Sequence, residues 1–184
     1  MGKEKDNQIL EAATSVFLRY GFRRTTMGDL AQAAGISRPA LYLRFCNKEN
    51  IFERVLQAFS ARTLDQIRSG LQDHPAPLEQ LQFAFECWAV KPFTLMQGSP
   101  DAKDLASCSL GFAATVKSQS HAAFEALLVP ILQRLPACQG QGVASPGAVA
   151  HVLAASVHGF KTEARDEAEL RGMIHTLLKL AVAS

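Results

Sequence analysis

Residues 20–56, YGFRRTTMGDLAQAAGISRPALYLRFCNKENIFERVL, contain the signals for two short helices joined by a tight turn. Thr26 followed three residues later by Asp29 fits a capping box, in which the two side chains satisfy backbone amides at the start of a helix. This pattern predicts a helix that continues to Ala34. Gly35 is expected to end it, because glycine is favoured just beyond a helix C-terminus.

The second short helix is expected to begin directly after that turn. Ser37 is suited to cap it, and Pro39 is tolerated because the first turn of a helix needs no backbone donor there. We predict that this helix runs to about Phe45. An earlier helix with one apolar stripe, ending at Gly21, precedes the pair. Three helices in this order are typical of a helix-turn-helix unit, whose second short helix enters the major groove of DNA.

The same stretch resembles the DNA-binding domain of the TetR family of bacterial transcriptional regulators, including its G-[IV]-S-x-x-x-L-Y-x-x-F-x-x-K-E core. The resemblance covers roughly residues 6–56, and beyond them only length and helical pattern agree. It implies a DNA-binding domain over residues 1–47 and an effector-binding and dimerisation domain over residues 48–184. It further implies a homodimeric, cytoplasmic repressor that binds double-stranded operator DNA and a small-molecule effector, and that is not an enzyme.

The resemblance also implies which residues bind DNA. Thr26, Tyr42 and Lys48 are expected to bind phosphates, since helix N-termini offer free amides, lysine adds a charge and a tyrosine hydroxyl donates a hydrogen bond. Arg38 is the main candidate for base reading, because an arginine there can bond O6 and N7 of guanine. Gly28 offers no side chain, so the first short helix is expected to read little sequence. The expected base-reading positions are Ser37, Arg38, Pro39, Ala40 and Arg44.

The remainder of the chain also shows helical spacing of apolar residues, without sustained alternation. The sequence therefore predicts an all-α fold of about nine helices, a three-helix N-terminal domain followed by a C-terminal helical bundle. A long helix capped by Asn47 is expected to join the two domains and to stop before Pro75. Pro92 is expected to break or kink the next helix. Separate helices are predicted around Val116 and around Phe124.

The C-terminal bundle is expected to provide the effector site and the dimer interface. Its middle helices are rich in aromatic residues that suit an apolar effector cavity. The candidates are Phe85, Trp88, Phe93, Met96, Phe112 and Phe124. Reading two operator half-sites requires a two-fold dimer. The last two helices are suited to form its interface, because they carry small residues beside large ones. The interface candidates are Val152, Ser156, Gly159, Phe160, Leu170, Ile174, Leu177 and Leu178. Ordinary core packing accounts for the same patterns, so the sequence leaves both assignments open.

Composition and charge agree with a soluble DNA-binding protein. The net charge is +2, and residues 1–50 hold eight Lys or Arg against five Asp or Glu, so the basic excess is N-terminal. Four cysteines without metal-ligand spacing predict free thiols in a reducing compartment. The N-terminus lacks the apolar core of a signal peptide, and no apolar run of about 18 residues predicts a membrane span.

Other classes of function have less support. Ser120, His121, His151 and His158 form no recognisable catalytic constellation, and no cofactor is implied. His151 and His158 lie seven residues apart and so share a helix face that suits a ligand or a metal, but a third metal ligand is lacking, and no metal is predicted. Cys46, beside the recognition helix, leaves a thiol switch open. The remaining alternative is a DNA binder without sequence preference. Competition with unrelated DNA would distinguish it from a sequence-specific regulator.

Overall fold

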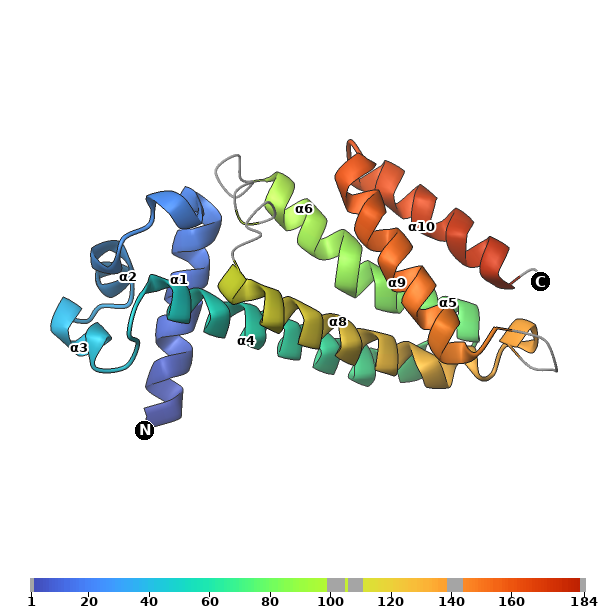
Figure 1. Cartoon of the computed structure of the whole chain (residues 1–184), viewed down its shortest axis with the longest axis horizontal. Coiled ribbons are helices and arrows are strands. Elements are labelled where there is room, and N and C mark those ends of the chain that lie inside the picture. The colour runs from blue at the N-terminus through green and yellow to red at the C-terminus, as the bar shows by residue number, and fades with distance from the viewer. Residues whose placement is uncertain (1, 99–104, 106–110, 139–143, 183–184) are drawn as a thin grey trace. The chain divides into compact units, whose positions relative to one another are not determined.

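A computed structural model of the chain describes residues 2–98, 105, 111–138 and 144–182, and these residues form helices joined by short connections (Figure 1). The prediction of an all-α chain is confirmed, and the predicted number of about nine helices is close to what the described residues form. They belong to two compact units, of which the first comprises Met1–Ser60 with Met96–Ser118 and the second Ala61–Leu95 with Gln119–Ser184. The functional boundary expected between residues 47 and 48 stays a prediction.

The first unit begins with α1, Gly2–Arg24, whose apolar stripe packs into the core of this unit. Gly21 interrupts α1 with φ 74° and ψ 170°, a conformation that glycine adopts without the steric cost of a Cβ atom. The prediction of a helix end at Gly21 therefore corresponds to a kink. Phe17, Phe22 and Phe52 pack together around it, with ring centroids 5.0 to 5.8 Å apart.

The capping box predicted at Thr26 is confirmed at the start of α2, Met27–Ala33. The amide of Asp29 donates to Thr26 Oγ1 at 3.2 Å, and the amide of Thr26 donates to Asp29 Oδ2 at 2.8 Å. Hydrogen bonds from the Thr26 hydroxyl and amide lower the pKa of the Asp29 carboxyl. Gly35 has φ 63° and makes the left-handed turn that the sequence predicts after this helix.

The recognition helix α3, Arg38–Tyr42, is shorter than predicted. Ser37 caps it as expected, since its Oγ accepts from the amide of Ala40 at 3.3 Å. Its predicted end at Phe45 is wrong, because the amides of Arg44 and Phe45 both turn back to the Leu41 carbonyl, each at 3.0 Å. Leu41 and Phe45 are buried at the two ends of this turn, which therefore anchors α3 to the core.

The long helix predicted after Asn47 is α4, Lys48–Gly70. The amide of Asn50 donates to Asn47 Oδ1 at 2.8 Å, which confirms the predicted cap. Ile51 and Phe52 of α4 belong to the core of the first unit, whereas Ile67 belongs to that of the second. One continuous helix thus contributes buried side chains to both units.

The second unit continues through four helical segments, of which the last three follow one another without a break. They are η1 (Leu71–Asp73, a 3-10 turn), α5 (Pro77–Phe85), η2 (Glu86–Val90, a π turn) and α6 (Lys91–Gln97). Pro92 was predicted to break or kink the helix, and the break is wrong, because the chain stays helical to Gln97. The amide of Lys91 bonds to the Glu86 carbonyl five residues earlier, and this wider turn directly precedes the proline.

The connection before α5 is held by Gln80, a polar side chain that is 8% exposed. Its Nε2 donates to the Leu71 carbonyl at 3.0 Å and to the His74 carbonyl at 2.7 Å, and its Oε1 accepts from Arg134. The Leu71 carbonyl also accepts from the amide of His74 at 3.2 Å, so the Gln80 side chain adds a second bond to it. Gln80 thereby fixes where His74 and α5 lie relative to each other.

The prediction of separate helices around Val116 and Phe124 is wrong, since both lie in α8, Gly111–Leu132. No proline or glycine separates the two residues, so the helix continues, and Pro130 is accommodated in its last turn. The two C-terminal helices are confirmed as α9, Pro146–Glu163, and α10, Glu167–Val182, which lie side by side (Figure 1). The connection from α8 to α9 contains η4, Pro136–Cys138, and residues 139–143 lie outside the described part.

Candidate functional site

The N-terminal unit presents an exposed surface on α3. Leu41 of α3 is fully buried, whereas Tyr42 is 45% exposed and Leu43 is 88% exposed. The Arg38 guanidinium lies 5.8 Å from the centre of the Tyr42 ring, a cation–π contact that places the two side chains together. We call Ser37, Arg38, Pro39, Tyr42 and Leu43 the recognition surface, since all five are exposed on or beside α3. It combines one positive charge, hydroxyl groups and apolar groups.

Leu43 is a member of this surface that the sequence analysis missed. It lies two residues from each of the buried residues Leu41 and Phe45, and residues two apart on a helical turn face different sides. That spacing was visible in the sequence and marks Leu43 as an outward-facing apolar residue. An exposed leucine beside a groove-reading helix is suited to contact a thymine methyl group.

Lys48 has a structural role in addition to the one predicted for it. Its Nζ donates to the carbonyls of Phe22 and Thr25, both at 2.8 Å, and lies 4.3 Å from the centre of the Phe22 ring. Two of the three ammonium donors therefore cap the carbonyls that follow the kink in α1. One donor and the positive charge are left for a phosphate.

Thr26 and Arg44, two other predicted DNA contacts, are bonded to acidic side chains. The Thr26 hydroxyl donates to Asp29 at 2.8 Å, and the Arg44 guanidinium forms an ion pair with Asp6 of α1. These bonds compete with contacts to DNA, because the same donors are used. Ala40, the remaining predicted base-reading residue, is half-buried.

The predicted effector residues are only partly brought together. Trp88 stacks on Phe124 at 4.5 Å with an interplanar angle of 5°, and Phe85 meets Phe124 edge-on at 5.2 Å. Phe85 and Phe124 are fully buried, so these three rings form close-packed core. Phe93 packs against the same core, and Met96 belongs to the first unit. The side chain of Phe112 lies outside the described part of the structure. The effector assignment stays a prediction.

The predicted dimer residues fall into two groups. The first group is buried in the chain's own core, with 0 to 4% exposure, and comprises Leu170, Ile174 and Leu178. The second group is partly or fully exposed on α9 and α10, and comprises Val152, Ser156, Gly159, Phe160 and Leu177. Val152 is 58% exposed, and Leu180 of α10, which the sequence analysis did not select, is 67% exposed. The second group, with Leu180, is available to a partner.

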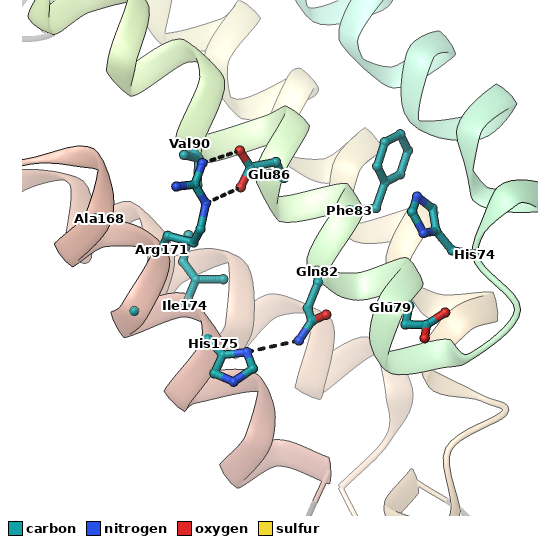
Figure 2. A pocket seen from close by; sticks show the side chains of 11 residues that line it. His74, Glu79, Gln82, Phe83, Glu86, Val90, Ala168, Arg171, Ile174 and His175 are labelled. Atoms are coloured by element: carbon teal, nitrogen blue, oxygen red, sulfur yellow. Dashed lines mark hydrogen bonds and ion pairs between the residues drawn. The ribbon is translucent and has the colours of Figure 1, made fainter.

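A groove within the second unit lies between α10 and the segment formed by α5 and the π turn η2 (Figure 2). Its volume is about 710 Å³. Its apolar lining residues are Phe83, Val90, Ala168, Gly172 and Ile174, and its polar ones are His74, Glu79, Gln82, Glu86, Arg171 and His175. Of the predicted effector residues whose side chains the structure describes, none lines it. Residue spacing in the sequence does not reveal this groove, because it forms between residues about 90 positions apart.

Polar pairs bridge the two sides of this groove. Arg171 of α10 donates to both carboxylate oxygens of Glu86, at 3.0 and 2.7 Å, and Gln82 lies 3.0 Å from His175 Nδ1 (Figure 2). Arg171 also donates to Glu167 at 2.6 Å, and Glu167 accepts from Thr94 at 2.7 Å. The carboxylates of Glu86 and Glu167 raise the pKa of the Arg171 guanidinium. The hydrogen bonds from Thr94 and Arg171 lower the pKa of the Glu167 carboxyl.

The histidines discussed in the sequence analysis pair across α8 and α9. His151 Nδ1 lies 3.0 Å from Glu125, and the rings of His158 and His121 are 5.6 Å apart. Within the described residues, no three His, Cys, Asp or Glu side chains are placed to hold a metal ion. Of the cysteines, Cys46 is exposed and Cys87 is buried, which raises the pKa of its thiol, while Cys108 lies outside the described residues. No described helix has the length and apolarity needed to span a bilayer.

Comparison with known proteins adds family information. A family model described as "Bacterial regulatory proteins, tetR family" matches residues 9–55. The uncharacterized HTH-type transcriptional regulator YfiR of Bacillus subtilis is 31% identical over 102 residues, which are 45% of this chain and 50% of that protein. The chain thus matches about half the length of that relative. These matches are to regulators and agree with the prediction that the chain is not an enzyme.

Solved structures extend the likeness of fold to the whole chain. A transcriptional regulator from Cytophaga hutchinsonii has a TM-score of 0.82 at 18% identity, covering 100% of this chain and 98% of that one. Thermus thermophilus FadR, a TetR-family transcriptional repressor solved in complex with lauroyl-CoA, has a TM-score of 0.65 at 20% identity, covering 96% and 92%. At such identities the comparison supports a shared fold alone.

Proposed function

Since the chain belongs to the TetR family of bacterial transcriptional regulators, we propose that it is a homodimeric repressor that binds a palindromic operator and releases it when a small apolar or aromatic molecule binds. The observation that carries this proposal is the recognition surface, with Arg38, Tyr42 and Leu43 exposed on a capped helix-turn-helix. Arg38 reads a guanine, Tyr42 donates to a phosphate and Leu43 contacts a thymine methyl group.

Release by an effector requires a physical connection between sensing and DNA reading. α4 supports this, because Ile51 and Phe52 are part of the core beneath the recognition surface while Ile67 is part of the second core. An effector that favours a shifted α4 moves the two recognition helices of the dimer out of register with half-sites about 34–36 Å apart. By the same coupling, operator DNA must weaken effector binding by an equal factor.

The experiment that tests the repressor proposal is selection of binding sites from random DNA with the purified full chain. We expect one palindrome to be enriched, and its affinity to exceed that of a scrambled duplex by at least about a thousandfold at 150 mM salt. The salt dependence of both duplexes is measured in parallel, since phosphate contacts alone give a steep but sequence-independent slope. Enrichment of no sequence would leave the non-specific DNA binder as the better description.

The dimer interface we propose is the outward face of α9 and α10, with Val152, Gly159 and Leu180 at its centre. Val152 and Leu180 are large and apolar yet more than half exposed, and a Cβ added at Gly159 meets no atom within 4 Å. Exposed apolar side chains and a glycine on the same pair of helices allow two copies to approach closely. Leu170, Ile174 and Leu178 support α10 from inside instead.

A Val152→Asp substitution is expected to raise the dimer dissociation constant by at least about 30-fold, because a buried interfacial charge without a partner costs about 2 kcal/mol or more. Sedimentation velocity over a concentration series measures this. The matched control is Leu43→Asp, which places the same charge on an exposed apolar position of the first unit and leaves dimerisation unchanged. Equal dimerisation of the Val152 variant and the unsubstituted chain would exclude this face.

A further inference from the structure

We propose that the groove between α10 and the α5–η2 segment binds the effector, and that the effector is a lipophilic aromatic cation. The assignment of this ligand as the effector rests on the proposed function, whereas the binding itself does not. Most small-molecule sites are concave, measure about 300–1,000 Å³ and have mainly apolar walls with a few convergent polar groups. The groove, at about 710 Å³, falls within that range.

The walls of the groove suit a bulky apolar body. Phe83, Val90 and Ile174 line it, and a Cβ added at Gly172 meets no atom within 4 Å. His74 and Phe83 form a pair of rings with centroids 4.6 Å apart, which adds an aromatic wall. By contrast, the rings of Phe85, Trp88 and Phe124 are in contact with one another and would have to separate to admit a ligand.

The charge of the groove selects a cation. Two carboxylates, Glu79 and Glu86, and one guanidinium, Arg171, line it, and Glu167 adds a further carboxylate bonded to Arg171. Counting Asp, Glu, Lys and Arg side chains, these four groups carry two more negative than positive charges. An anion would have to displace Glu86 or Glu167 from Arg171 and leave a carboxylate without its partner. A cation instead gains attraction from the excess carboxylates.

The two sides of the groove are also placed to transmit binding. Glu86 is the first residue of the π turn, a wider helical turn that is often found at functional sites. It joins α10 through Arg171, while Glu167 joins Thr94 of α6. A cation in the groove draws on the same carboxylates and so weakens these bonds between α10 and the α5–α6 segment.

The test uses two probes of nearly equal shape and opposite charge, tetraphenylphosphonium and tetraphenylborate, titrated calorimetrically into the full chain. We expect the cation to bind at least about tenfold more tightly than the anion. Gly172→Leu, which fills the groove, is expected to weaken cation binding by at least about tenfold, with Gly147→Leu as the matched control. Glu79→Gln, which keeps the shape, is expected to weaken it by about three- to tenfold, with Glu163→Gln as its control.

The outcomes separate the site from the proposed function. No cation binding, equal affinity for the two probes, or unchanged affinity in both groove variants would overturn the groove proposal, whether or not the chain binds an operator. Selective cation binding that both variants weaken supports it, even if no operator is enriched in the selection experiment. Sedimentation velocity and thermal melting of each variant verify that it remains folded and dimeric, and the Glu79 variant tests charge even if the Gly172 variant does not fold.

Discussion

An Arg38→Ala substitution is expected to weaken binding to the selected operator by about 5- to 150-fold, the loss of about 1–3 kcal/mol that a bidentate arginine–guanine contact contributes. Its affinity for scrambled DNA is expected to change far less. Arg38 makes no specific base contact there, so its loss removes only one positive charge from the salt-dependent, sequence-independent part of binding. Fluorescence anisotropy with both duplexes at two salt concentrations measures the two effects.

Two further variants identify the cause. Arg38→Lys keeps the charge but loses the planar fork of donors, so it should resemble the alanine variant on the operator. Arg54→Ala removes another exposed arginine, which lies on α4 outside the recognition surface, and should leave the operator affinity unchanged. If Arg38→Ala weakened binding to every sequence by the same factor, Arg38 would be a phosphate ligand and another residue would read the bases.

A Lys48→Met substitution is expected to lower the free energy of unfolding by about 3 kcal/mol, because the Phe22 and Thr25 carbonyls lose a charged donor. For a chain of this size that corresponds to a fall in melting temperature of about 6–12 °C. Thermal and urea unfolding followed by circular dichroism measure it, and Lys5→Met, an exposed lysine of α1, serves as the control.

The same variant distinguishes the two roles of Lys48. A stable Lys48→Met protein with weaker binding to all DNA would make phosphate binding its main role and would contradict the capping role. A destabilised protein that binds DNA normally at low temperature would make capping its main role. The geometry favours capping as the main role of Lys48, since two of the three donors of its ammonium group are already bonded.

Local signals in the sequence were sufficient for the helix-turn-helix. Thr26, Asp29, Ser37 and Gly35 act through neighbours within a few residues, so their effects can be predicted from spacing alone, and the structure has both caps and the left-handed turn. The end of α3 could not be predicted in this way. The turn that ends α3 buries Phe45 in a core that also contains Phe17 of α1 and Ile51 of α4, and these residues are distant in the sequence.

Features that depend on distant contacts were predicted less well. The aromatic residues of the middle helices were expected to line a cavity, yet Trp88 and Phe124 are stacked on each other, and spacing alone does not separate a packed ring from an open one. The groove instead involves Glu86 and Arg171, which are 85 residues apart. The dimer candidates Leu170 and Ile174 have the right periodicity but face the chain's own core.

The π turn Glu86–Val90 also bears on how this chain tolerates changes of length. A π turn is geometrically an α-helix with one residue too many, and each residue of an α-helix advances the chain by about 100° around the axis. Deleting a single residue here would therefore restore regular helical geometry and leave α6 close to its present rotational phase relative to α5. A deletion in the regular helix on either side would instead turn every side chain beyond it by about 100° around the helix axis. The π turn is thus the place in this segment where the loss of one residue disturbs the pairing of Thr94 with Glu167 least.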